Sequence, residues 1–236
     1  MDVIECIKTR RTIHKYTKQP VEFDKLMACI EAGMNAPSSG NIQNWMFVVT
    51  LDKKKIHTSL CDACLGQECL TSAQAVIILC ADEDMAERHY GLRGKRLYSI
   101  QNCAANIQNM LLCAHALGLG AAWIGAFDED HVKRLFAMPE CARPQAVLTF
   151  GYPAEKPPPK RMRHIDDLTR WESYSMRYKD AHRSLRDFSV EWEKQIEEAK
   201  YRFADPVENI KKKAKKIFGK KEPPEDEKKD TNLYGG

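Results

Sequence analysis

The chain has 236 residues, which is room for one ordinary domain and a short extension. Apolar residues make up 43% of it and charged residues 30%, which indicates a globular protein and excludes a fibrous or wholly disordered one. The formal net charge of +4 is too small to predict a nucleic-acid partner. The first residues lack the basic start and apolar run of a signal peptide, and the 9 cysteines suggest no disulfide framework, so we expect a cytoplasmic protein.

Apolar periodicity predicts the elements of the first 165 residues. Helical spacing predicts helices over residues 2–9, 23–34 and 99–117, and apolar runs predict strands over residues 45–51, 75–80, 121–126 and 145–150. The first two strands are almost continuously apolar, which indicates a sheet covered on both faces. The stretch 97–127 carries no charge, but its amides would be costly in a bilayer, so we predict a buried helix rather than a membrane span.

The chain is expected to divide into three parts. Residues 1–170 form the predicted folded domain, and residues 171–205 belong to a long charged helix that starts at Arg170. Residues 206–236 hold 9 lysines against 6 acidic residues, a net of +3, and are expected to form a short basic helix and a disordered tail.

Two polar segments of the predicted domain carry candidate chemistry. Residues 10–16 (RRTIHKY) combine guanidinium, hydroxyl and imidazole groups that suit a phosphate, although a solvated basic turn has the same composition. Residues 36–45 (APSSGNIQNW) join a helix to a strand, and their hydroxyls and amides suit a planar polar heterocycle or a polyol. The alternative for this second segment is an ordinary turn-rich loop.

Two glycine- and proline-containing segments complete the set. Gly125, in residues 118–127 (GLGAAWIGAF), allows a flat ligand to approach the backbone, but the glycine spacing fits neither a dinucleotide-binding fingerprint nor a phosphate loop. Residues 151–163 (GYPAEKPPPKRMR) follow the last predicted strand and present a second basic cluster.

These four segments, in this order, resemble the nitroreductase family of FMN-dependent oxidoreductases over roughly residues 1–170. The resemblance implies an α+β fold with a mainly antiparallel central sheet wrapped by helices. It also implies a homodimer with one FMN in each of two interfacial sites.

The resemblance implies roles for particular residues. The FMN phosphate would be held by Arg10, Arg11, Thr12, His14, Arg161 and Arg163, with Lys160 able to replace either of the last two. The flavin would be contacted from the other subunit by Pro37, Ser38, Ser39 and Asn41. Backbone amides of Gly125 and Ala126 would face the reactive N5 edge of the flavin, where they would favour negative charge.

The implied activity is an oxidoreductase reaction. NADH or NADPH would reduce FMN, and a nitroaromatic, quinone or similar conjugated small molecule would then be reduced in a ping-pong sequence. No side chain is expected to act as a dedicated acid or base, because the cofactor supplies the chemistry. The sequence departs from the family pattern at Asn44, where proline is usual, and at Asn102, where an acidic residue is frequent.

Two other interpretations remain open at this point. Cys61, Cys64 and Cys69 with His57 resemble part of a metal site, but no second cysteine pair follows, so we predict no metal. Alternatively, the protein is a flavin-binding or dimerising module whose basic segment 206–221 docks weakly to a membrane or an acidic partner. The terminal Tyr234-Gly235-Gly236 supports no role by itself.

Overall fold

The computed structural model describes residues 1–177, which belong to two separate units. The first unit is Met1–Lys160, and the second begins at Arg161. The predicted site residues fall in the first unit, with the exception of Arg161 and Arg163.

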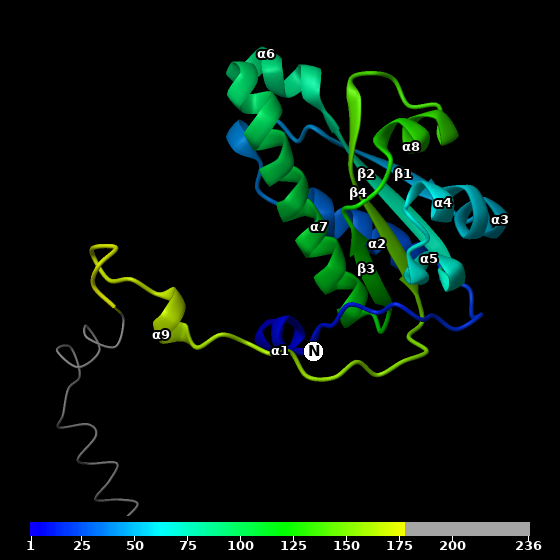
Figure 1. Cartoon of the computed structure of the whole chain (residues 1–236), viewed down its shortest axis with the longest axis horizontal. Coiled ribbons are helices and arrows are strands. Elements are labelled where there is room, and N and C mark those ends of the chain that lie inside the picture. The colour runs from blue at the N-terminus through cyan, green and yellow to red at the C-terminus, as the bar shows by residue number, and fades with distance from the viewer. Residues whose placement is uncertain (178–236) are drawn as a thin grey trace, which may run out of the picture. The chain divides into compact units, whose positions relative to one another are not determined.

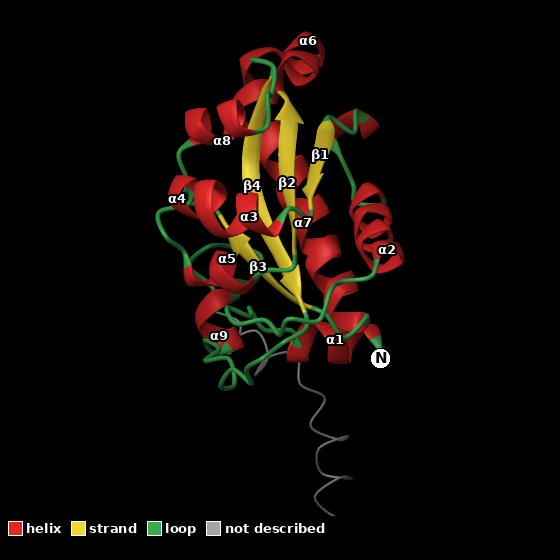
Figure 2. Ribbon diagram, turned by 90° about the vertical axis from the view of Figure 1, so that its right-hand side faces the viewer, coloured by secondary structure: helices red, strands yellow, loops and turns green. Residues whose placement is uncertain are grey.

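A four-stranded antiparallel sheet forms the centre of the first unit (Figure 2). Its strand order is β1-β2-β4-β3, and the four strands are β1 (Trp45–Thr50), β2 (Ala75–Asp82), β3 (Gly120–Ile124) and β4 (Ala142–Gly151). Strand β2 pairs with β1 on one side and β4 on the other, so its residues are buried from Ala75 to Ala81. This arrangement explains why the strand has no polar face.

Helices α2 (Phe23–Met34) and α7 (Ser99–Ala116) pack together and contribute to one hydrophobic cluster with the sheet. The two helices approach closely at Gly33, where an added Cβ would lie 2.6 Å from Oδ1 of Asn106. Helix α7 ends as expected, because Gly118 adopts a φ of +78° and the amide of Leu119 donates to the carbonyl of Ala114 at 2.8 Å.

Short helical segments contribute to a second hydrophobic cluster, which also contains buried residues of the strands. Apart from α1 (Val3–Thr9) at the N-terminus, the remaining helical segments of the first unit are α3 (Lys53–Lys55), η2 (Ile56–Leu60), α4 (Cys61–Ala63), α5 (Glu68–Ser72), α6 (Glu83–Arg93), η3 (Gly94–Tyr98), α8 (Glu129–Leu135) and the single turn η1 (Ser39–Asn41). Most are three to seven residues long, too short to display a helical period in the sequence.

The N-terminal arm is attached to the edge of the sheet. After α1 (Val3–Thr9), the amide of Ile13 donates to the carbonyl of Ala121 at 3.2 Å, and the amide of Thr17 donates to the carbonyl of Tyr152 at 2.9 Å. Two glycines make room for the arm: an added Cβ on Gly120 would lie 2.8 Å from Ile13, and one on Gly151 would lie 2.7 Å from Tyr16.

The predicted α+β fold with a mainly antiparallel sheet is confirmed, as are the three predicted helices and four strands, with small shifts at their ends. One such shift matters for the site: the strand predicted over residues 121–126 ends at Ile124, so Gly125 and Ala126 lie outside it.

The helix predicted from Arg170 is wrong at its start. The second unit contains α9 (Ile165–Leu168) followed by a turn in which Arg170 and Arg177 form a β-bridge. The remainder of that predicted helix, the basic helix and the tail lie in residues 178–236, outside the described residues. Within residues 1–177, no helix has the length and apolar character needed to cross a membrane.

The amide of Asn106 generates a prediction about stability. Its side chain is fully buried, and neither Oδ1 nor Nδ2 has a hydrogen-bond partner among the described residues. Because an unpaired buried amide costs free energy, Asn106→Ala is expected to raise the free energy of unfolding by about 1 kcal/mol, measured by urea denaturation.

Asn109 supplies the matched control on the same helix. Its Nδ2 donates to the carbonyl of Ala32 at 3.1 Å, so Asn109→Ala removes a hydrogen bond that is made and is expected to destabilise the protein. Equal destabilisation by the two substitutions would contradict the interpretation of Asn106.

Candidate functional site

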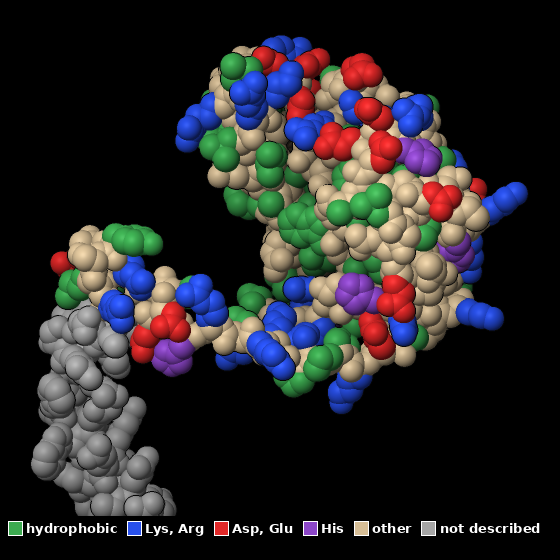
Figure 3. Space-filling model, in the orientation of Figure 1, with side chains coloured by type: hydrophobic (Ala, Val, Ile, Leu, Met, Phe, Trp, Pro, Cys, Tyr) green, Lys and Arg blue, Asp and Glu red, His purple; other side chains and the backbone are tan. Residues whose placement is uncertain are grey.

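Three cations lie together where α1 ends. Arg10 is the C-terminal cap of α1, Arg11 follows it, and Nζ of Lys160 lies 3.4 Å from the carbonyl oxygen of Ile7. Burial lowers the pKa of Lys160, and the charges of Arg10 and Arg11 lower it further. Figure 3 shows Lys and Arg side chains gathered on the first unit around α1. We call Arg10, Arg11 and Lys160 the cation cluster.

The cation cluster lacks a counter-ion among the described residues. None of the ion pairs within residues 1–177 includes a member of the cluster. Nη1 of Arg11 is buried and makes no hydrogen bond there. A buried guanidinium nitrogen without an acceptor is costly, and an anion with several oxygens would satisfy it. The arrangement therefore fits a bound phosphate group.

His115 borders the cluster from α7. The hydroxyl of Thr9 donates its proton to the carbonyl of Glu5 at 2.7 Å, so Nε2–H of His115 must donate to Oγ1 of Thr9 at 2.9 Å. Burial lowers the pKa of His115, and the charges of Arg10 and Lys160 lower it further. The imidazole is therefore held neutral as a hydrogen-bond donor beside the cations.

The other predicted phosphate residues of the arm are exposed. Thr12 forms a parallel bridge with Ala121 at the edge of the sheet. The backbone amides of His14 and Lys15 donate to a carboxylate oxygen of Glu155 at 2.5 and 3.2 Å, and these bonds lower the pKa of Glu155. A carboxylate next to His14 disfavours a phosphate there, so the cluster is the stronger anion site of the two.

The segment 37–41 forms a compact loop with an unusual backbone. Gly40, Asn41 and Gln43 have φ angles of +55°, +57° and +48°. Oγ of Ser38 accepts the amide of Gln43 at 3.1 Å, and Oδ1 of Asn102 accepts the amide and hydroxyl of Ser39 at 2.9 and 3.2 Å. Pro37 and Asn41 are exposed beside this anchored turn.

The loop and the cation cluster lie at opposite ends of α7. Asn102 contacts the loop near the start of the helix, and His115 contacts α1 near its end (Figure 1). These two residues are 13 positions apart, which corresponds to about 20 Å along a helix. The structure therefore brings Arg10 and Arg11 together with Lys160, but it does not bring the loop to them within one chain.

Gly125 and Ala126 follow β3 and are exposed. An added Cβ on Gly125 would meet nothing within 4 Å. The backbone at this position is therefore open. Whether its amides face a flavin stays a prediction.

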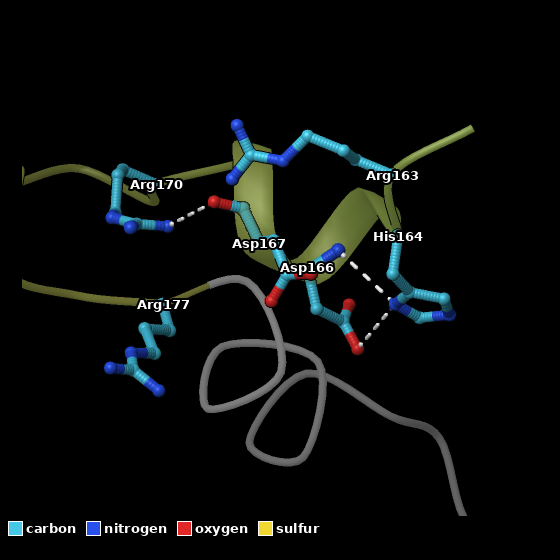
Figure 4. A pocket seen from close by; sticks show the side chains of 6 residues that line it. All are labelled: Arg163, His164, Asp166, Asp167, Arg170 and Arg177. Carbon is cyan, nitrogen blue, oxygen red and sulfur yellow. Dashed lines mark hydrogen bonds and ion pairs between the residues drawn. The ribbon is translucent and has the colours of Figure 1, made fainter. Parts of the chain in front are cut away.

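Arg161 and Arg163 belong to the second unit. Arg163 lines a polar pocket of about 440 Å³ with five neighbours of that unit: His164, Asp166, Asp167, Arg170 and Arg177 (Figure 4). Their predicted contact with phosphate is untested, whereas Lys160 of the same basic segment does lie beside Arg10 and Arg11. The sequence assigns this contact to Arg161 and Arg163, with Lys160 able to replace either, and Lys160 is the residue that lies beside Arg10 and Arg11.

The cysteines near His57 are buried thiols. Cys61, Cys64 and Cys69 belong to the second hydrophobic cluster, and burial raises the pKa of Cys64 to about 12. A ring nitrogen of His57 is hydrogen-bonded to the carbonyl of Ala73 at 2.9 Å. These side chains pack as part of the core.

Comparison with known proteins decides the family. The model described as "Nitroreductase family" matches residues 7–68 and 57–152. The chain belongs to the nitroreductase family. This match confirms the family inferred from the four segments, and the protein is an enzyme of that family.

Individual relatives agree with the family model. A Methanothermobacter thermautotrophicus protein with the provisional name NADH dehydrogenase/NAD(P)H nitroreductase is 36% identical over 161 residues, covering 66% of this chain and 80% of its own. The Bacillus subtilis FMN reductase [NAD(P)H] is 27% identical over 187 residues, covering 73% and 74%. A crystal structure from Bacteroides thetaiotaomicron, also provisionally named NADH dehydrogenase/NAD(P)H nitroreductase, is 31% identical with a TM-score of 0.64, covering 73% and 98%.

The lowered pKa of His115 predicts how stability depends on pH. The folded protein binds the imidazole proton less tightly than the unfolded chain does, so stability is lost as pH falls through the usual histidine value of about 6.5. Between about pH 7.5 and about pH 5.5, the wild type should lose more stability than His115→Gln, which keeps an N–H donor but cannot titrate. Urea denaturation at both pH values measures this difference, and equal losses would contradict it.

Proposed function

We propose that this nitroreductase-family enzyme binds FMN and uses NADH or NADPH to reduce a conjugated small molecule such as a nitroaromatic or a quinone. The observation that carries the proposal is the cation cluster, in which Nη1 of Arg11 is buried and has no hydrogen-bond partner among residues 1–177. A phosphate monoester supplies the oxygens that this nitrogen lacks. The printed names of relatives, which include an FMN reductase and NAD(P)H nitroreductases, support the same cofactor and donor.

The protein's own contribution is binding and positioning. Bound FMN would supply the redox chemistry, accepting a hydride from the nicotinamide and returning electrons to the second substrate. Arg10, Arg11 and Lys160 would hold the phosphate, and neutral His115 would keep Thr9 in place without adding charge. The open backbone at Gly125 leaves room for a flat ring, and no dedicated acid or base is needed. Two substrates that use one open face in turn give ping-pong kinetics.

A homodimer completes this proposal. The loop at Ser39 and the cation cluster are about 20 Å apart along α7, so a flavin held by one cluster would take its loop contacts from a second copy. Exposed apolar residues on α1 and α2 suit such an interface, and they are Val3, Ile4, Ile7, Phe23, Met27 and Met34. Light scattering that gave the mass of one chain for the flavin-loaded protein would exclude the dimer.

An absorption spectrum tests the activity directly. The purified protein, after incubation with FMN and removal of unbound flavin, is expected to retain the flavin bands. Anaerobic addition of NADH or NADPH should then bleach them, because hydride transfer reduces the bound flavin. A protein that retains no flavin would overturn the proposal, and retained flavin that neither nucleotide reduces would overturn the donor.

The phosphate contact predicts the effect of one substitution. Arg11→Ala removes a charged hydrogen-bond donor to the phosphate, so FMN affinity should fall by about 2 kcal/mol, or about thirtyfold. Titration of flavin fluorescence measures the affinity. Arg134→Ala, which removes the same charge from an exposed position on α8, is the matched control and should leave the affinity unchanged. Equal affinities for Arg11→Ala and the wild type would remove the phosphate assignment.

A further inference from the structure

We propose that Asn102 is the positioning residue of the flavin loop, and that Asn44 orients the Asn102 amide for this task. The flavin loop is the segment 37–41, and the inference rests on the proposed function. It assigns roles to Asn44 and Asn102, the two positions at which the sequence departs from what the resemblance implies.

The two residues contact one another in the core. Nδ2 of Asn102 donates to Oδ1 of Asn44 at 2.8 Å, and the side chains are 3% and 1% exposed. Asn44 immediately precedes β1, and Asn102 lies in the first turn of α7. Two departures that are 58 positions apart in the sequence therefore meet in a single hydrogen bond.

The surroundings of Asn44 leave its amide one orientation. Its Nδ2 donates to the carbonyl of Asp82 at 3.1 Å and to Oγ of Ser99 at 3.0 Å. The hydroxyl of Ser99 is itself committed as a donor to the carbonyl of Gly94 at 3.1 Å, so it can only accept from Asn44. Oδ1 of Asn44 is therefore left to accept, and its neighbour must be a donor.

This requirement fixes the orientation of Asn102. Its Nδ2 must face Asn44, so its Oδ1 faces the flavin loop, where it accepts from the amide and the hydroxyl of Ser39 at 2.9 and 3.2 Å. Donation thus runs from Ser39 inward, through the amides of Asn102 and Asn44, to the carbonyl of Asp82 and, by way of the Ser99 hydroxyl, to the carbonyl of Gly94. Each amide has partners at both ends, which is the condition under which a buried polar network gives a unique arrangement.

A carboxylate at position 102 would disturb this order. One of its oxygens could still accept from Ser39, but the other would lie against Oδ1 of Asn44, so two acceptors would be in contact without a proton between them. If alanine replaced Asn44, that conflict would disappear. The asparagine at each position is therefore matched to the other.

The flavin loop needs such an anchor because its backbone is strained. Asn41 in the loop and Gln43 just after it hold φ angles of +57° and +48°, a region in which residues other than glycine are destabilised. The hydroxyl of Tyr90 also lies against Gly40, where a side chain would clash with it. Asn102 fixes the loop on its buried side and so prepares Ser38 and Ser39 for a ligand before that ligand binds.

A double-mutant cycle on the full-length protein tests the inference, with FMN affinity measured by fluorescence titration. Asn102→Ala should weaken FMN binding about tenfold, because Ser39 loses its acceptor. Asn102→Asp should weaken binding by a similar factor in the wild-type background but by less than about threefold in the Asn44→Ala background. The near-ultraviolet and visible circular dichroism of the bound flavin should change in the same variants.

Asn109→Ala is the matched control, because it removes an amide hydrogen bond from the same helix without touching the loop. It should lower stability while FMN affinity stays at the wild-type value. Wild-type affinity in Asn102→Ala would overturn the role of Asn102, and an equal effect of Asn102→Asp in both backgrounds would overturn the role of Asn44. Failure of the wild type to bind FMN would instead refute the proposed function, so the two failures are distinguishable.

Discussion

The packing of α7 against the sheet and α2 is the constraint on which the rest of the structure depends. Two candidate functional segments are tied to this helix: the flavin loop through Asn102, and the end of α1 through His115. The helix can take this role because Gly33 lets α2 approach it closely, which leaves little freedom for either helix to shift. Its length therefore sets the separation of the two half-sites within one chain.

The sequence predicts the helices and strands whose residues follow one clear apolar period. Helix α7 and strand β2 have strong apolar patterns, and they form where those patterns predict them. The helices between β1 and β2 show no such pattern, because each is only three to five residues long and is held by contacts with distant residues. Tertiary packing decides whether such short segments are helical, and the local sequence carries little information about that packing.

The candidate site shows the same division. The composition of residues 10–16 fits both an anion site and a solvated basic turn, and it does not indicate that Glu155 accepts the amides of His14 and Lys15. The family pattern marked Asn44 and Asn102 as unusual without indicating that they touch. Their contact depends on the register between β1 and α7, and that register is a property of the folded core rather than of either segment.

The glycines that receive the N-terminal arm have a consequence for how natural variation in this protein would be interpreted. Ile13 and Tyr16 occupy the space that a side chain at Gly120 or Gly151 would need. A single methyl group at either position would displace Ile13 or Tyr16, and so disturb the arm that carries Arg10 and Arg11, although no charge and no polar atom had changed. A natural variant with alanine at one of these glycines would count as a conservative substitution, and its effect on anion binding would still resemble the effect of losing an arginine.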